Sequence, residues 1–229
     1  MSEKLIVDKI VFLDIDGVLN SEEWADKCFN KLVSDDICDS DVDPDAINRL
    51  IKFLNDTNAK IVLSSSWRSL NVKSTILEFS TFNHELLKKL IPYIIGVTPR
   101  FYEYRKRGNE IKYWMDMLST DYNALVKRGY ILENVELSKN YKYVIVDDDS
   151  DMLRGQNFVQ TDFHTGFTDE DVNESFLRNV SMTREKLKFI YLIIIHRSSP
   201  MKTRCIETTS RVIEHHTYRM SRIAKFYKS

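Results

Sequence analysis

The sequence predicts a three-layer α/β fold with a mainly parallel central sheet, because three apolar runs each end on polar side chains. These runs span residues 10–13, 60–63 and 143–146. The first ends on paired acids, the second on hydroxyl groups and the third on an acidic cluster. Since open α/β sheets carry their chemistry at the carboxyl ends of parallel strands, we expect these polar groups to share one edge of the sheet.

The first run leads directly into Asp14-Ile15-Asp16-Gly17. Alternation along a strand turns Asp14 and Asp16 to the same side, and Gly17 permits a sharp turn behind them. One carboxylate can then attack while the other handles a proton. A calcium loop would need further oxygen ligands at short spacing, whereas apolar residues follow here.

The segment between the first two runs predicts an open site. Residues 21–42 are too few for an independent lid, so we expect a minimal cap or none. Asp43 as N-cap and Pro44 in the first turn predict a helix that continues through Leu54 and ends within 55–58. The side chains that could face the entrance are Trp24, Phe29, Trp67 and Arg68.

Three further polar segments follow along the chain: first hydroxyl groups, then cations and then acids. The second run ends on three consecutive serines, Ser64 to Ser66. A basic patch at 105–107 opens a predicted helix through Trp114 and Met117. The third run ends on the cluster 147–151, which holds four acids. Thr168 before three acids predicts a further helix N-terminus.

The four segments in this order resemble the motifs of the haloacid dehalogenase (HAD) superfamily of phosphotransferases. A more specific resemblance is to the HAD domain of Swiss Army Knife RNA repair proteins and its phage and viral relatives. The strings that carry it are FLDIDGVLN, DPDAINRLIKFLNDTNAKIVLSSSWR, RGNEIKYW, VIVDDDSDM and FVQTDFHTGFT. They span roughly residues 8–170 and imply a Rossmann-like fold.

The resemblance implies a phosphatase, a hydrolase of phosphate monoesters that works through an aspartyl-phosphate. It gives Asp14 the role of nucleophile and Asp16 the role of general acid and base. Ser65 and Arg107 would bind the transferring phosphoryl group, although Ser64 stays open as an alternative to Ser65. Arg107 stands where the superfamily more usually has lysine, which keeps the charge and adds a forked donor.

The resemblance also implies Mg²⁺ as the cofactor, held by Asp14, the backbone carbonyl of Asp16, and Asp147 or Asp148. The sequence leaves the choice between Asp147 and Asp148 open, and we favour Asp148. A further acid usually follows the paired acids of this motif. Asp151 fits that position only if the motif is counted from Asp147.

A polynucleotide end as the substrate, and hence a role in nucleic acid repair, is an expectation from the resemblance alone. A small-molecule phosphatase or nucleotidase would use the same residues. A non-catalytic interaction protein is disfavoured, because the acids, the hydroxyl group and the cation are all present. The sequence does not distinguish a 3′-phosphate from a 5′-phosphate and does not indicate the oligomeric state.

The composition favours an intracellular enzyme. The chain has 229 residues, of which 43% are hydrophobic and 29% are charged, enough for one substantial core. Its three cysteines are widely spaced, which argues against a disulfide framework or a zinc site. We expect a cytoplasmic or nuclear protein that is neither secreted nor membrane-bound, since the apolar run 189–195 is too short to span a bilayer.

The C-terminal segment differs from the rest of the chain in charge. Residues 183–229 carry 11 Lys and Arg against 3 Asp and Glu, a balance of +8 in a chain whose net charge is −1. We therefore divide the chain into a catalytic domain, 1–182, and a basic, helical extension, 183–229. The extension either packs on the sheet with its basic side in solvent, the interpretation we slightly favour, or contacts nucleic acid.

Overall fold

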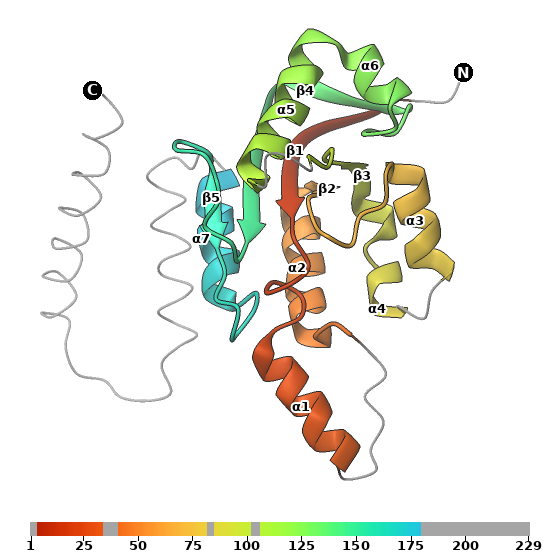
Figure 1. Ribbon diagram of the computed structural model, residues 1–229. Helices are drawn as coiled ribbons and strands as arrows, with labels where there is room; N and C mark the ends of the chain where they lie inside the picture. The colour runs from red at the N-terminus through yellow and green to blue at the C-terminus, as the bar shows by residue number, and fades with distance from the viewer. Residues whose placement is uncertain (1–3, 34–40, 82–84, 102–105, 180–229) are drawn as a thin grey trace, which may run out of the picture. The chain divides into compact units, whose positions relative to one another are not determined.

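The computed structural model describes residues 4–33, 41–81, 85–101 and 106–179. Five parallel strands form its central sheet in the order β3-β2-β1-β4-β5 (Figure 1). Their bounds are β1 Leu5–Leu13, β2 Lys60–Leu63, β3 Ile94–Val97, β4 Val135–Asp147 and β5 Phe158–Gln160. The prediction of an α/β fold with a mainly parallel sheet is confirmed.

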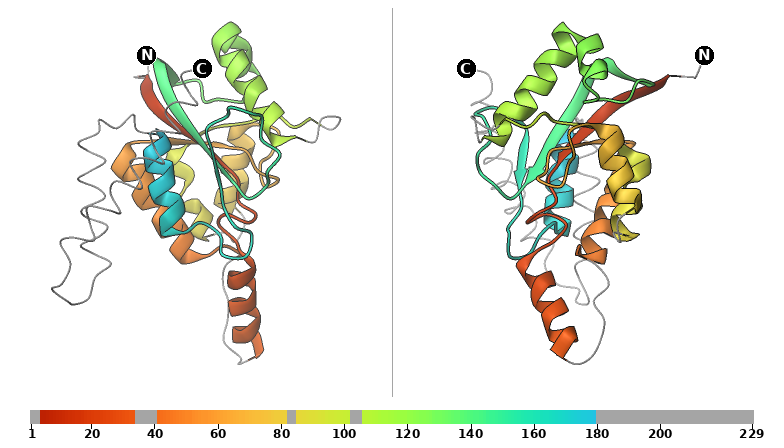
Figure 2. Two further views of the ribbon diagram at one scale, coloured as in Figure 1. Left: turned by 90° about the vertical axis from the view of Figure 1, so that its left-hand side faces the viewer. Right: turned by 45° about the vertical axis from the view of Figure 1, so that its right-hand side comes forward.

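Helices cover both faces of this sheet. They are α1 Glu22–Val33, α2 Pro44–Thr57, α3 Val72–Thr81, α4 Glu85–Lys88, α5 Arg107–Thr120, α6 Tyr122–Lys127 and α7 Asp169–Asn179, with a 3₁₀ turn, η1, at Ile91–Tyr93. In the left view of Figure 2, α5 lies on one side of the strands, and α2 and α7 lie on the other. The sheet between two helical layers is the three-layer arrangement that the sequence predicts.

Alternation along β1 divides the core into two. Val11 and Leu13 belong to the cluster that includes the apolar side chains of α2 and α3. Ile10 and Phe12 belong to the opposite cluster, with α5 and α6. There the ring of Trp114 meets Phe12 edge-on, with centroids 5.5 Å apart. A central strand buried on both faces explains why this run is continuously apolar.

The predicted helix boundaries agree with the structure. Asp43 caps α2 by accepting a hydrogen bond from the N–H of Asp45, and Asn58 ends the helix in the left-handed conformation. Thr168 precedes α7 and accepts a hydrogen bond from the N–H of Asp171. The carboxylate of Asp171 accepts two hydrogen bonds from Thr168 in return. This reciprocal pattern is a capping box.

Two features of the sheet lie beyond the sequence prediction. The short apolar run Ile94–Val97 forms β3, at one edge of the sheet. β4 begins at Val135, well before the predicted run, and its pairing with β1 shifts register between Val7 and Lys9. Between these pairs β1 advances by two residues, whereas β4 advances by five, from Leu137 to Lys142, which breaks the alternation. The polar first half of β4 therefore does not resemble a buried strand.

Cys28 is disulfide-bonded, and a single bond is not the disulfide framework that the cysteine spacing argues against. Pairing depends on how closely two cysteines approach in space, which their number and spacing do not fix. No helix in the described ranges combines the length and apolar character needed to cross a membrane. The predicted basic extension, 183–229, lies outside the described residues, and its helical character and domain boundary stay predictions.

Candidate active site

The polar groups expected at one edge of the sheet lie together there. Asp14 follows β1, Ser65 lies just beyond β2, and Asp147 is the last residue of β4. Because β2, β1 and β4 are parallel neighbours, their carboxyl ends are adjacent. The arrowheads of β1 and β4 point to this edge in Figure 1. Arg107, the first residue of α5, reaches the same place.

Asp14 is a buried carboxylate between a cation and a hydroxyl group. Its side chain is 5% exposed, and its Oδ1 accepts a hydrogen bond from the N–H of Ile15 at 2.8 Å. Burial raises the pKa of Asp14, while the Arg107 guanidinium and a hydrogen bond with Ser65 lower it. These contacts fix the orientation of the carboxylate, which suits a nucleophile that must attack in line.

Arg107 joins the two buried acids. Its Nη2 lies 3.4 Å from Oδ2 of Asp14, and its Nε lies 3.5 Å from Oδ2 of Asp147. Its Nη1 donates to the carbonyl of Ser64. The backbone N–H of Arg107 donates to the carboxylate of Asp151 at 2.8 Å, so Asp151 holds the start of α5. The resulting forked cation at the sheet edge is suited to phosphate oxygens.

Three acids could hold a divalent cation. One carboxylate oxygen from each of Asp14, Asp147 and Asp148 lies within 4.8 Å of the others. Burial and the neighbouring Asp14 raise the pKa of Asp147 to about 8, and the same two causes raise the pKa of Asp148. The described residues donate no hydrogen bond to Oδ2 of Asp147. Closely spaced carboxylates, one of them with an oxygen that accepts no hydrogen bond, fit a hard cation such as Mg²⁺.

Gly17 allows the loops after β1 and β4 to approach each other. Its φ is +66°, and a Cβ at this position would lie 2.4 Å from Cγ of Asp148. Any side chain would therefore both strain the backbone and displace the carboxylate of Asp148. The sequence suggested Gly17 for a turn. The same glycine also makes room for Asp148, one of the three acids that could hold a cation.

Asp16 lies at the open side of the site, held by three donors. Asn20 and Trp67 donate to its Oδ1 at 3.0 and 2.8 Å, and Ser66 donates to its Oδ2 at 2.7 Å. Burial alone raises its pKa, but these hydrogen bonds outweigh burial, and the pKa of Asp16 is lowered. No sequence pattern predicts the hydrogen bonds that Asn20 and Ser66 donate to Asp16. Asn20 stands within the first motif string, but a polar residue four positions after an acid is too common to be a signal.

The structure distinguishes the two serines that the sequence left open. The hydroxyl of Ser64 hydrogen-bonds with Thr98, beyond β3, at 3.1 Å. Ser65 instead lies beside Asp14, where its side chain lowers the pKa of that carboxyl, and its hydroxyl oxygen accepts the N–H of Trp67 at 3.2 Å. The geometry therefore favours Ser65 as the hydroxyl beside the nucleophile.

A buried ion pair supports the serine loop from behind. The guanidinium of Arg68 lies 2.6 Å from the carboxylate of Glu110, and the two side chains are 3% and 11% exposed. Arg68 also donates to the carbonyls of Ser65, Thr98 and Pro99. Arg68 therefore ties the end of β2 to the end of β3 and to α5. It does not face the entrance, and that expectation is wrong.

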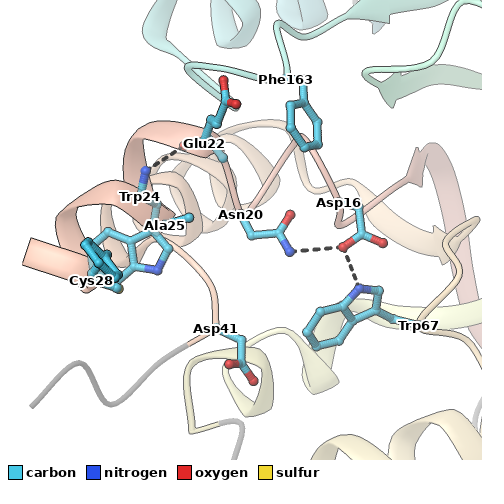
Figure 3. A pocket seen from close by; sticks show the side chains of 11 residues that line it. Asp16, Asn20, Glu22, Trp24, Ala25, Cys28, Asp41, Trp67 and Phe163 are labelled. Carbon is cyan, nitrogen blue, oxygen red and sulfur yellow. Dashed lines mark hydrogen bonds between the residues drawn. The ribbon is translucent and has the colours of Figure 1, made fainter. Parts of the chain in front are cut away.

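A groove of about 830 Å³ opens beside Asp16. Trp24, Phe29 and Trp67 line it, as expected for the entrance, together with Phe163 from the loop after β5. In Figure 3, Asn20 and Trp67 reach the same oxygen of Asp16. Asp16 thus stands between the buried carboxylates and a groove rich in aromatic rings.

A family described as the HAD domain in Swiss Army Knife RNA repair proteins matches residues 10–172, from within β1 to the start of α7. No curated protein and no solved structure matches the chain. The matched range contains every residue that the sequence analysis assigned to the site.

Proposed function

The chain belongs to the family of HAD domains in Swiss Army Knife RNA repair proteins and is a phosphomonoester hydrolase, and from this premise we propose that it removes the terminal phosphate of a polynucleotide through a covalent intermediate on Asp14. The observation that carries the proposal is the surroundings of Asp14. This carboxylate is buried, lies beside Ser65 and 3.4 Å from Arg107, and Asp147 and Asp148 lie close by.

In the first step, a carboxylate oxygen of Asp14 attacks phosphorus. The new bond forms as the bond from phosphorus to the leaving oxygen breaks, and Asp16 gives its proton to that oxygen. The hydrogen bonds from Asn20, Ser66 and Trp67 orient Asp16 for this transfer and favour the carboxylate that remains once its proton has left.

In the second step, Asp16 takes a proton from water. The water oxygen attacks phosphorus, the bond from phosphorus to Asp14 breaks, and inorganic phosphate leaves. Asp16 is then protonated again, and both acids have returned to their starting forms. The net reaction adds one water molecule across the phosphate ester.

Arg107 and Ser65 bind the oxygens of the group in transfer and offset their charge in the transition state. Asp14, Asp147, Asp148 and the backbone carbonyl of Asp16 would hold Mg²⁺. When bound, the cation supplies the positive charge that lets an anionic carboxylate meet an anionic phosphate.

The decisive experiment is a search for the intermediate. Purified protein is mixed with a phosphorylated oligonucleotide in the presence of Mg²⁺ and quenched in acid, and the peptide that contains Asp14 is weighed by mass spectrometry. We expect a mass increase of one phosphoryl group in the wild type and none in Asp14→Asn. Turnover without any such increase, or with the group on another residue, would contradict the proposal.

The family's printed description, which refers to RNA repair proteins, supports a polynucleotide substrate. A minimal cap also leaves the site open to a large molecule. The groove could equally hold a mononucleotide, so the second candidate is a nucleotidase. Phosphate release from 3′- and 5′-phosphorylated oligonucleotides, measured beside the matching mononucleotides, separates the two. Higher kcat/KM on the mononucleotides would favour the second candidate.

A further inference from the structure

The groove beside Asp16 lies on the side of the leaving group. Asp16 forms part of its wall, whereas Asp14 does not line it. Since Asp16 must reach the leaving oxygen to give it a proton, the rest of the leaving group must extend from that oxygen into the groove. The groove volume of about 830 Å³ falls within the range of sites that bind small molecules.

Aromatic rings from three separate parts of the chain line this groove. Trp24 and Phe29 come from α1, Trp67 follows β2, and Phe163 follows β5. Figure 3 shows Phe163 and Trp67 on opposite sides of Asp16, with Trp24 across the groove from them. The rings of Phe29 and Phe163 are not buried, with exposed fractions of 66% and 54%. Exposed rings around a hollow are the usual surface on which unpaired bases stack.

The charge of the groove limits which part of a substrate fits there. The described residues that line it include the acids Asp16, Glu22 and Asp41, but neither Lys nor Arg. Carboxylates repel phosphate groups and accept hydrogen bonds from N–H and O–H groups. A neutral base with its ribose therefore suits the groove, whereas a run of backbone phosphates does not.

Backbone hydrogen bonds join the two walls of the groove. The N–H groups of Glu22 and Glu23, at the start of α1, donate to the carbonyls of Phe163 and His164 at 3.2 and 3.0 Å. The loop that carries Phe163 closes with a hydrogen bond from Gly166 to Asp162 at 2.8 Å. A backbone held in this way loses little conformational freedom on binding.

We propose that the groove binds the terminal nucleoside of the strand that leaves, with its base stacked on Phe163, Trp67 and Trp24. This inference rests on the proposed function and names the part of the polynucleotide that the protein recognises. The ester oxygen lies at Asp16, the phosphate lies toward Asp14 and Arg107, and the base lies among the rings. Recognition through stacking predicts a requirement for a base at the phosphorylated end.

The test compares two oligonucleotides that are identical except at the phosphorylated terminal residue. One carries a base there, and the other carries an abasic sugar. Binding is measured by fluorescence anisotropy on the full chain with Asp14→Asn, so that no turnover occurs. We expect the oligonucleotide with the base to bind roughly 5- to 100-fold more tightly, as one stacked base provides.

Three further variants, each in the Asp14→Asn background, assign the effect to the groove. Phe163→Ala should reduce the ratio of the two dissociation constants roughly fivefold or more, because the stacking surface is lost. Phe163→Tyr keeps the ring and should keep the ratio. Leu77→Ala removes a side chain that is 62% exposed on α3, away from the groove, and should also keep it.

Equal dissociation constants for the two oligonucleotides would overturn the inference. A ratio that Phe163→Ala leaves unchanged would do the same, with folding confirmed by thermal melting. A wild-type protein that releases no phosphate from any oligonucleotide would instead count against the proposed function. A failure of the inference can be told apart from a failure of the proposed function, because the ratio of dissociation constants is measured on a variant that does not turn over.

Discussion

At the scale of single residues, the site separates two acids of one short motif by their surroundings. Asp14 is buried, and burial raises its pKa, whereas the hydrogen bonds of Asp16 lower the pKa of that residue. The two acids are only two positions apart in the sequence. Asp14 faces the guanidinium of Arg107, whereas Asp16 faces the groove. The positions of the two acids, and not the directions of their pKa shifts, support separate roles as nucleophile and proton carrier.

The separate roles predict different responses to substitution. Asp14→Asn should abolish turnover, because the amide has nearly the same shape but is a poor nucleophile. Asp16→Asn should reduce kcat strongly with an alkyl phosphate, by roughly 10²- to 10⁴-fold, and less with an aryl phosphate whose leaving group needs little protonation. Steady-state kinetics on the two substrates measures this difference. Equal losses in Asp16→Asn on both substrates would contradict its role as general acid.

The cluster formed by Asp14, Asp147 and Asp148 predicts which acids control the Mg²⁺ requirement. Replacing Asp147 or Asp148 with Asn should raise the Mg²⁺ concentration needed for half-maximal activity, because each removes an oxygen from the cluster. Asp149→Asn is the matched control, since Asp149 is exposed and lies outside the cluster. A Mg²⁺ titration of the three variants measures the effect. An equal shift in all three would show that the cluster is wrongly assigned.

The raised pKa of Asp147 predicts how stability depends on pH without metal. Its folded-state pKa, about 8, lies above its ordinary value, so the folded state binds the proton more tightly than the unfolded state does. The stability of the metal-free protein should therefore rise as pH falls from about 8 toward about 4.

Thermal melting in a chelator measures this dependence. Asp147→Asn lacks the titrating group, so its Tm should rise less than that of the wild type over the same pH range. At the upper end of the range, the variant should be the more stable protein, because it carries no buried charge there. Parallel curves for the two proteins would contradict the raised pKa.

At the scale of elements, buried polar contacts fix the loops that carry the site. The Arg68–Glu110 pair joins the ends of β2 and β3 to α5, and Glu110 also accepts the N–H of Phe101 at 2.9 Å. Burial lowers the pKa of Arg68 to about 10, so the guanidinium stays charged at neutral pH. A buried charge that stays ionised depends on its partner.

Glu110→Gln should therefore destabilise the protein by roughly 3 to 5 kcal/mol, because it leaves the Arg68 charge buried without an acid. The matched control is Asp116→Asn on the same helix, which breaks the exposed Lys112–Asp116 pair and should cost about 0.5 kcal/mol or less. Urea unfolding of both variants measures the two values. Similar losses in the two variants would mean that the buried pair does not hold these loops together.

At the scale of the whole molecule, charge is unevenly distributed along the chain. Residues 183–229 carry a balance of +8, so the preceding residues carry −9. A long polynucleotide is repelled by an acidic protein body, and a basic segment can offset that repulsion. The extension lies outside the described residues, and its role is open to a test on the full chain.

If the extension contacts nucleic acid, removing its charge should weaken oligonucleotide binding, and the loss should shrink as salt rises. The variant changes four cations of the extension to Gln, at Arg211, Arg219, Arg222 and Lys225. The matched control changes four exposed lysines of the catalytic domain to Gln, at Lys4, Lys52, Lys73 and Lys112.

Binding of a long phosphorylated oligonucleotide, measured at several salt concentrations, compares the two variants with the wild type. The extension variant should show a shallower salt slope than the control variant, which has the same net charge. Equal slopes for the two variants would assign the effect to net charge alone. Unchanged affinity in the extension variant would exclude a nucleic-acid role for its four cations.

The sequence by itself determined the parallel sheet, the ends of β1, β2 and β4, and the caps of α2 and α7. Each depends on local patterns: apolar runs, alternation along a strand, and capping side chains next to the helix. The tertiary structure alone decided that Ser65 rather than Ser64 lies beside Asp14, and that Trp67 and Ser66 hold Asp16. These contacts join residues about fifty positions apart, so they depend on strand register and loop path, which no local pattern specifies.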